Sequence, residues 1–300
     1  MNMYSLPKKV TIIEVGPRDG LQNEKNVVPT DVKLLFIEQL QKAGVEEMEL
    51  SSFVSPKWVP QMSDAKEIVT NAKKVGRQFV LTPNKKGIDL ALENGAKSVA
   101  VFVGVSDSFN KKNINKTTRE SMNELKPLVE KLIEDGYFVR ACISTAFYCP
   151  FEGAVDPEKV TELCKEFVSW GVQELSVADT IGMANPKESY ALFHTLINVF
   201  PHTLITAHFH DTRKMGIANI FAALQAGVSR FDTSAGGLGG CPFAPGATGN
   251  VATEDVVNML HKMDITTNID IDELLNAVDI ISPYVSRPIE TGMYKLFKSK

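Results

Sequence analysis

Short apolar segments alternate with longer amphipathic segments along almost the whole chain of 300 residues. The short segments are rich in valine, isoleucine and phenylalanine, which is typical of buried β-strands. They lie at 10–15, 47–50, 78–81, 98–103, 138–144, 174–178, 204–209 and 230–234. The amphipathic segments predict helices at 29–43, 63–74, 88–94, 119–134, 156–170, 187–199, 217–226 and 254–263. An alternation of this kind indicates an α/β protein with a parallel sheet.

Eight strand-and-helix units suit an α/β fold of the (β/α)8 TIM-barrel type, followed here by a short C-terminal helical extension. Sequence runs such as VTIIEV and VAVFV are apolar on both faces, as parallel strands covered on both sides are. A doubly wound open sheet is the main alternative, but it should carry a glycine fingerprint after its first strand, where this chain has Gly-Pro-Arg-Asp-Gly. We predict a single domain over 1–300, with the barrel at about 8–265 and a tail at 266–300. The tail should contain a helix near 271–285 and pack on the barrel.

Charge and composition exclude several classes of protein. The 32 Lys and Arg against 36 Asp and Glu give a net charge of −4 without a strongly basic half, which disfavours binding to nucleic acid or to a membrane surface. No run reaches the roughly 18 apolar residues of a membrane-spanning helix. The N-terminus enters a strand almost at once, so we expect no signal or transit peptide. Four cysteines without a CxxC pair suit a reducing compartment, and we expect a cytoplasmic protein.

Unusual polar residues gather where the predicted strands end, which is the active face of a TIM barrel. The seventh strand ends in His208-Phe209-His210-Asp211. Side chains alternate along a strand, so His208 and His210 should point the same way and reach one cation. We favour a metal site here over the alternative, a pair of hydrogen-bonded histidines lining a polar pocket. Asp211 should point away and either start the next helix or support the ligands.

Charged residues also follow the first two strands. Asp19 offers a hard oxygen ligand, and Arg18 beside it offers a fixed positive fork for an oxyanion or a carboxylate. An Arg-Asp turn on the surface is the alternative. Glu49, at the end of the second strand, is expected to face the interior and to pair with Arg18, although a solvated carboxylate fits the spacing equally well.

A segment rich in glycine and proline, 235–250, follows the eighth strand, and its composition indicates unusual backbone angles. Within it, Cys241 offers a thiol for proton transfer and Asn250 offers an amide oxygen. A phosphate-cradling turn or a mobile surface loop is the alternative. Asp19, His208, His210 and Asn250 together form a ligand set without thiolate, which suits Mg²⁺ or Mn²⁺ better than structural zinc. Such a cation can chelate a hydroxyl and a carbonyl together, as carbon–carbon cleavage next to a tertiary alcohol requires.

Three segments resemble the 3-hydroxy-3-methylglutaryl-CoA lyase family of the metal-dependent barrel lyases and Claisen-type synthases. They are VGPRDGLQNE at 15–24, SFVSPKWVPQM at 52–62 and GLGGCP at 237–242, and the resemblance runs from about residue 10 to residue 292. The cysteine loop is specific to the lyases, whereas the Arg-Asp and His-x-His motifs are shared with the synthases. The resemblance implies a TIM barrel that cleaves 3-hydroxy-3-methylglutaryl-CoA (HMG-CoA) to acetyl-CoA and acetoacetate in leucine degradation.

The resemblance also implies roles for individual residues. The divalent cation would be bound by Asp19, His208, His210 and Asn250. Arg18 would stabilise the enolate, and Glu49 would orient that arginine and help to hold the water shell of the metal. Cys241 and His208 are the two candidates for proton transfer, and the sequence does not decide which of them deprotonates the hydroxyl. Asp179 would have a catalytic or substrate-orienting role, with a turn-capping aspartate as an equally good interpretation.

Substrate contacts and rival functions complete the sequence-based hypotheses. Lys25 and Lys111 are candidates for contact with the phosphates of a CoA thioester, although a solvated basic loop at 106–119 is the better interpretation of any single lysine there. We expect a homodimer and a prokaryotic-type cytoplasmic enzyme, without the leader and C-terminal cysteine of some eukaryotic members. The rivals are a lyase for a longer-chain 3-hydroxyglutaryl-CoA, a condensing synthase, and a non-catalytic metal-binding barrel.

Overall fold

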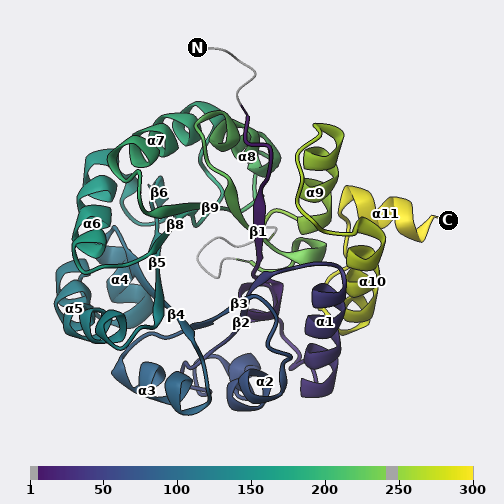
Figure 1. Cartoon of the computed structure of the whole chain (residues 1–300), viewed down its shortest axis with the longest axis horizontal. Coiled ribbons are helices and arrows are strands. Elements are labelled where there is room, and N and C mark those ends of the chain that lie inside the picture. Colours follow the sequence, from purple (N-terminus) through teal and green to yellow (C-terminus); the bar gives the residue numbers. More distant parts are fainter. Residues whose placement is uncertain (1–5, 241–248, 300) are drawn as a thin grey trace.

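The computed structural model describes residues 6–240 and 249–299. Eight parallel strands close into a barrel in the order β1-β10-β9-β8-β5-β4-β3-β2, and helices surround it (Figure 1). The strands are β1 (Thr11–Glu14), β2 (Glu47–Ser52), β3 (Arg77–Leu81), β4 (Ser98–Gly104), β5 (Phe138–Ser144), β8 (Glu174–Asp179), β9 (Leu204–Phe209) and β10 (Arg230–Thr233). The predicted TIM barrel is therefore confirmed, and the closed sheet excludes the doubly wound alternative.

All eight predicted helices are present on the outside of the barrel. Side-chain capping fixes the start of several of them: Asn185, before Pro186, accepts hydrogen bonds from the backbone of Lys187 and Glu188, and the Glu188 carboxylate accepts one from the Asn185 amide. They are α1 (Thr30–Lys42), α2 (Ala65–Asn71), α3 (Lys85–Glu93), α5 (Thr118–Glu134), α6 (Pro157–Ser169), α7 (Pro186–Val199), α8 (Gly216–Gln225) and α9 (Thr253–Lys262). No helix in the described part of the chain is both long and apolar enough to cross a membrane.

The segment 106–119 is not the loop that we predicted. It contains a ninth outer helix, α4 (Asp107–Ile114), which begins where the Ser106 side chain accepts a hydrogen bond from the Phe109 amide. It ends at Asn115, which takes the left-handed conformation with φ of 57°. The helix is short and mostly polar, so no apolar periodicity signals it. A small hairpin, β6 (Tyr148–Cys149) and β7 (Gly153–Ala154), was also not predicted.

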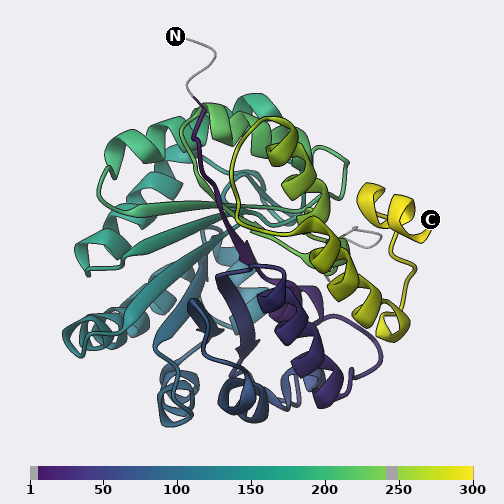
Figure 2. The same ribbon diagram turned by 45° about the vertical axis from the view of Figure 1, so that its right-hand side comes forward.

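The C-terminal tail packs on the barrel beside α1, as Figure 2 shows. Helix α10 (Ile271–Ile281) starts where predicted but ends before residue 285, because Pro283 lacks an amide donor and a 3₁₀ turn, Ser282–Tyr284, follows. A further helix, α11 (Gly292–Lys298), was not predicted. The Asp270 amide donates to the Ala43 carbonyl at 2.8 Å, and Gln39 Nε2 donates to the Glu273 carbonyl at 3.1 Å. These bonds join the tail to the end of α1.

Charged side chains fill the barrel interior near the N-terminal ends of the strands. They alternate in sign along one chain of contacts, which we call the ion chain: Arg77, Glu47, Arg230, Glu174, Arg140 and Asp232. Arg140, the fifth of these six residues, has no exposed surface and lies between Glu174 at 3.7 Å and both carboxylate oxygens of Asp232. Burial would lower the pKa of Arg140, but Asp232 and Glu174 raise it well above its usual value. Each charged side chain in the ion chain is therefore stabilised by a neighbour of opposite charge.

Candidate active site

A cavity of about 220 Å³ opens at the C-terminal ends of the barrel strands. One side of it is charged and polar, with side chains from β1, β2 and β9. Their residues are Arg18, Asp19, Glu49, His208 and His210. The other side is apolar and includes Leu81 and Phe102. The barrel thus brings the sequence-predicted residues of three separate strands to one cavity.

The segment after β1 turns Arg18 and Asp19 into this cavity. Residues Gly16–Gly20 form a single π-helical turn, in which the amides of Asp19 and Gly20 both bond to the Val15 carbonyl at 2.7 and 3.1 Å. Gly16 permits this turn because a Cβ there would lie only 2.6 Å from Glu14 Oε1. Arg18 and Asp19 are each 8% exposed, so the alternative of a surface turn is wrong.

The carboxylate of Glu14 ties this turn to the loop after β10. It accepts hydrogen bonds from the Gly16 amide at 2.7 Å, the Ala235 amide at 2.9 Å and the Thr253 hydroxyl at 2.6 Å. Burial raises the pKa of Glu14 to about 7, although these three hydrogen bonds oppose the shift. Within the part of the chain that the structure describes, Glu14 has no ion-pair partner, unlike the carboxylates of the ion chain.

The Arg18 guanidinium is fixed by two carboxylates. Its Nε donates to Glu49 and its Nη1 donates to Asp19 Oδ1 at 2.6 Å, which leaves Nη2 without a hydrogen-bond partner among the described residues. The predicted pairing of Glu49 with Arg18 is thus present, and the solvated alternative is wrong because Glu49 is buried. Burial would lower the pKa of Arg18, but Glu49 and Asp19 raise it above its usual value. A permanent cation therefore faces the cavity.

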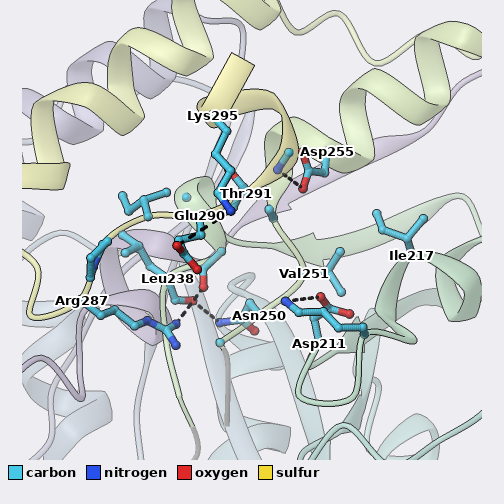
Figure 3. Close-up of a pocket in the computed structure, with 18 residues that line it drawn as sticks. Asp211, Ile217, Leu238, Asn250, Val251, Asp255, Arg287, Glu290, Thr291 and Lys295 are labelled. Atoms are coloured by element: carbon cyan, nitrogen blue, oxygen red, sulfur yellow. Dashed lines mark hydrogen bonds and ion pairs between the residues drawn. The ribbon is translucent and has the colours of Figure 1, made fainter. Parts of the chain in front are cut away.

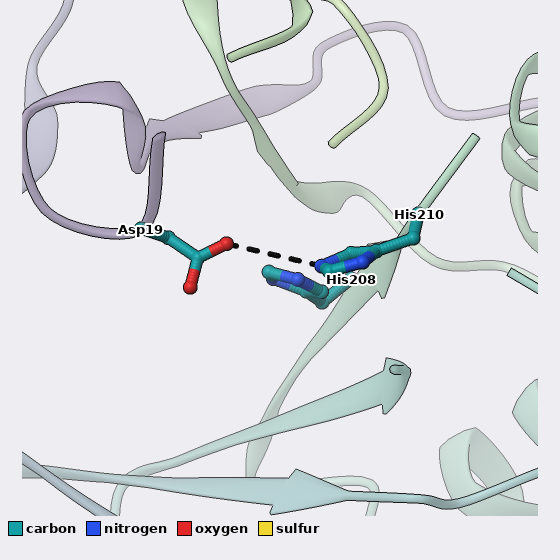
Figure 4. Close-up of side chains that lie close together, drawn as sticks. All are labelled: Asp19, His208 and His210. Atoms are coloured by element: carbon teal, nitrogen blue, oxygen red, sulfur yellow. Dashed lines mark ion pairs between the residues drawn. The ribbon is translucent and has the colours of Figure 1, made fainter. Parts of the chain in front are cut away.

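The two histidines lie on the same side of the end of β9, as predicted. Their ring centroids are 5.2 Å apart, while Phe209 between them points outward and packs on Phe193 of α7 with centroids 5.8 Å apart. His210 Nε2 lies 3.8 Å from Asp19 Oδ2, which follows β1, two strands along in the barrel order (Figure 4). Strand parity places the two histidines on one side, and barrel closure brings Asp19 to them.

Asp19, His208 and His210 form a candidate metal centre, since one ligand atom from each lies within 4.8 Å of the others. Burial would raise the pKa of Asp19, but Arg18 and the two histidines hold it well below its usual range, so this carboxylate is ionised at neutral pH. His210 Nδ1 is buried and has no hydrogen-bond partner among the described residues. An anionic oxygen and two imidazoles fit a divalent cation.

Asn250 lies beside this cluster, but its side-chain nitrogen, and not its oxygen, faces Asp19. Its Nδ2 donates to Asp19 Oδ2 at 2.7 Å and to the Leu238 carbonyl at 3.1 Å. Its Oδ1 is buried and has no hydrogen-bond partner within the described residues. Rotating the amide by half a turn would exchange the two atoms and bring Oδ1 toward Asp19. The structure thus places Asn250 next to the other predicted ligands in an orientation that the sequence could not specify.

Asp232 is a site residue that the sequence analysis missed. Its Oδ2 lies 3.1 Å from His208 Nδ1 and accepts a hydrogen bond from the Ser176 hydroxyl at 2.8 Å. Burial would raise the pKa of Asp232, but Arg140 and His208 lower it well below its usual range. Asp232 therefore joins the ion chain to the candidate metal centre. The available signal was an aspartate inside a strand that is otherwise buried, because such a charge needs a partner.

Two aspartates at strand ends hold the loops instead of lining the cavity. The Asp179 carboxylate accepts hydrogen bonds from the amides of Met183 and Ala184, both at 3.0 Å, which are the contacts of a turn-capping residue. Burial raises the pKa of Asp179, and these two bonds oppose the shift. Its catalytic role stays a prediction of the family resemblance. Asp211 Oδ1 accepts a hydrogen bond from the Gly216 amide at 2.8 Å, at the first residue of α8, as predicted for a helix-start residue.

The remaining predicted residues lie outside the cavity or outside the described residues. Lys25 and Lys111 are exposed, and neither lines the 220 Å³ cavity. Lys111 belongs to α4, whose Phe109 and Asn113 line the cavity. Cys241 falls in 241–248, outside the residues that the structure describes.

A larger cavity of about 690 Å³ lies between the loop after β10 and the C-terminal tail (Figure 3). On its wall, Arg287 Nη2 donates to the carbonyls of Gly237 at 3.2 Å and Gly239 at 2.7 Å. Asn250 lines this cavity and contacts Asp19 of the smaller one. The metal-ligand cluster belongs to the smaller cavity, so we place the chemistry there.

Comparison with known proteins points to one family. Residues 9–281 match the model of the HMGL-like family. The chain is 45% identical over 298 residues to the hydroxymethylglutaryl-CoA lyase YngG of Bacillus subtilis, covering 98% of this chain and 99% of the relative. The solved hydroxymethylglutaryl-CoA lyase of Pseudomonas aeruginosa matches with a TM-score of 0.94 at 39% identity, over 98% of this chain and 99% of that one. An HMG-CoA lyase from Acinetobacter baumannii, solved in complex with coenzyme A and 3-methylmalate, matches with a TM-score of 0.91 at 36% identity, over 96% and 95%.

Proposed function

The chain belongs to the HMGL-like family, and on this premise we propose that it is a hydroxymethylglutaryl-CoA lyase. It is a carbon–carbon lyase that cleaves HMG-CoA to acetyl-CoA and acetoacetate. The observation that carries the proposal is the convergence of Asp19, His208 and His210 beside the fixed cation Arg18 in one cavity. The reaction develops two negative charges, an alkoxide and an enolate. In this proposal the metal-ligand cluster stabilises the alkoxide and Arg18 stabilises the enolate.

The reaction is a retro-Claisen cleavage. The hydroxyl on C3 loses its proton, the bond between C2 and C3 breaks, and C3 becomes the ketone carbon of acetoacetate. The electron pair of the broken bond passes to the thioester as an enolate, and a proton added to C2 completes acetyl-CoA. Proton removal and enolate formation are therefore the two steps that the protein must assist.

A divalent cation held by Asp19, His208, His210 and the amide oxygen of Asn250 would lower the pKa of the hydroxyl and polarise the nascent ketone. We propose Mg²⁺ or Mn²⁺, because the ligand set is free of thiolate. The ionised Asp19 carboxylate supports a cation at this position, as does the buried Nδ1 of His210, which has no hydrogen-bond partner among the residues described.

Arg18 stabilises the enolate oxygen in this proposal. Glu49 and Asp19 fix its guanidinium through Nε and Nη1, so Nη2 is available to a developing oxyanion. A preorganised donor of this kind contributes about 10²- to 10³-fold to the rate. We assign the two proton transfers to His208 and Cys241, and Asp179 keeps the substrate-orienting role that the resemblance implies.

The substrate is a CoA thioester, and we propose that Lys25 and Lys111 meet its phosphates at the rim. We also propose that the enzyme is a cytoplasmic homodimer that acts in leucine degradation. These assignments rest on the family resemblance and on the exposure of both lysines.

The decisive experiment is a steady-state assay of HMG-CoA cleavage with and without EDTA, combined with calorimetric titration of Mn²⁺. We expect EDTA to abolish turnover and added Mn²⁺ to restore it. Asp19→Ala should lose Mn²⁺ binding, whereas the control Asp211→Ala, which removes the neighbouring carboxylate at the start of α8, should keep it. Tight Mn²⁺ binding without thioester cleavage would contradict the proposal and favour a non-catalytic metal-binding barrel.

A further inference from the structure

The apolar side of the active-site cavity faces the metal-ligand cluster across the barrel. In the closed order of strands, β3 stands opposite β9, β4 opposite β10 and β5 opposite β1. Leu81, Phe102 and Cys142 project from β3, β4 and β5 and line the cavity together. We call these three residues the apolar wall.

The apolar wall is a continuous surface. Phe102 and Cys142 are paired in register on neighbouring strands, so their side chains lie on the same face of the sheet. Leu81 belongs to the same apolar cluster, which also includes Phe102 and Cys142. Burial raises the pKa of Cys142 to about 12, so its thiol is neutral at physiological pH. The wall therefore carries no charge.

The cavity is closed below this wall. Phe79 and Arg140 occupy the next layer toward the N-terminal ends of the strands, and neither has any exposed surface. The Arg140 guanidinium lies 5.2 Å from the centre of the Phe79 ring, so these two side chains pack on each other and form a floor. A group that enters along the wall meets this floor after a short distance.

We infer that the apolar wall holds the alkyl substituent on C3 of the substrate, and that Phe102 and Cys142 limit its size to a short chain. This inference rests on the proposed function. Of the four groups on C3, the hydroxyl, the carboxymethyl group and the thioester arm all carry polar atoms. The methyl group alone gains from contact with uncharged carbon and sulfur. Because the floor is closed, the substrate class is a 3-hydroxyglutaryl-CoA with a small 3-alkyl group.

The test compares kcat/KM for three substrates that differ only at C3: 3-hydroxyglutaryl-CoA, HMG-CoA and 3-hydroxy-3-propylglutaryl-CoA. One methylene in an apolar pocket changes such ratios by about 10- to 200-fold. The wild type should prefer HMG-CoA to both others. Phe102→Ala should raise the propyl-to-methyl ratio at least about 10-fold, with Phe102→Leu intermediate, and Cys142→Phe should reduce the preference for methyl over hydrogen.

The matched control is Phe167→Ala, which also truncates a phenylalanine, but one that is buried, packs on Trp170 and does not line the cavity. It should leave both ratios unchanged. Ratios between substrates on one enzyme preparation are independent of the fraction that folds. If the wild type cleaves HMG-CoA but the Phe102 and Cys142 variants keep its ratios, the inference is overturned and the proposed function stands. If the wild type cleaves none of the three substrates, the proposed function fails first, and the inference fails with it.

Discussion

Two layers of buried charge fill this barrel, and they differ in which charges face one another. In the ion chain Arg140 and Arg230 each lie between two carboxylates, Arg230 between Glu47 at 2.5 Å and Glu174 at 3.2 Å, although Arg140 Nε and Nη1 and Arg230 Nε have no hydrogen-bond partner among the described residues. At the mouth, His210 Nδ1 and Asn250 Oδ1 are buried without a hydrogen-bond partner in the part of the chain described. The comparison teaches that opposite charges face one another throughout the ion chain, whereas at the mouth one carboxylate and two imidazoles face one another around a candidate metal centre.

Asp232 belongs to both layers. It is the last carboxylate of the ion chain and the hydrogen-bond partner of His208. Its position predicts that the ion chain and the candidate metal centre are coupled. Variants in the ion chain and variants beside His208 can therefore separate effects on stability from effects on metal binding.

The largest effect is expected from Arg140→Met, which breaks the ion chain between Glu174 and Asp232. The change leaves Asp232 and Glu174 buried without their shared cation, which should lower the free energy of unfolding by about 3–5 kcal/mol. Arg77→Met is the matched control, because Arg77 ends the same chain, also stacks on a phenylalanine and has a side chain that is 32% exposed. The control should cost only about 0–1 kcal/mol. Equal losses in denaturant titrations of both variants would show that the chain does not act as a paired layer.

A smaller effect is expected from Asp232→Asn, at the junction of the layers. The carboxylate fixes His208 with Nδ1–H toward Asp232 and leaves the lone pair of Nε2 free for a metal ion. Its loss should weaken Mn²⁺ binding by about 10- to 100-fold. Ser176→Ala removes a different hydrogen bond to the same Asp232 oxygen and should have a smaller effect. Calorimetric titration measures both, and unchanged Mn²⁺ affinity in Asp232→Asn would confine Asp232 to the ion chain.

The smallest effect concerns Glu14, a buried carboxyl without an ion-pair partner among the described residues. Its pKa is about 7 in the folded protein against 4.5 for an ordinary glutamate, so the folded state keeps a proton that the unfolded state has released. The contribution of Glu14 to the free energy of unfolding is therefore largest at low pH and is lost as the pH rises through 7. The loss is about 1 kcal/mol between about pH 6 and pH 8. Glu14→Gln should remove this slope, while Glu254, whose pKa burial also raises to about 7, contributes to both proteins. Parallel unfolding free energies of wild type and variant across this pH range would disprove the prediction.

The strands and the shared face of the two histidines were predictable because both follow from local pattern. Apolar runs fix the eight strands to within two residues, and the period of two places His208 and His210 on one face. The ion chain was not predictable, because Arg140 and Asp232 are 92 positions apart and only barrel closure brings them together. The orientation of the Asn250 amide was equally out of reach, since it depends on Asp19, which is 231 positions away.

The ion chain also restricts how a protein of this kind can change over generations. Because its members alternate in sign, losing one of them leaves a neighbouring charge without its opposite partner. A tolerated replacement at one position should therefore be accompanied by a compensating replacement at the adjoining one. Descendants of a common ancestor should consequently vary at these six positions in concert, while the individual apolar residues around them drift one at a time.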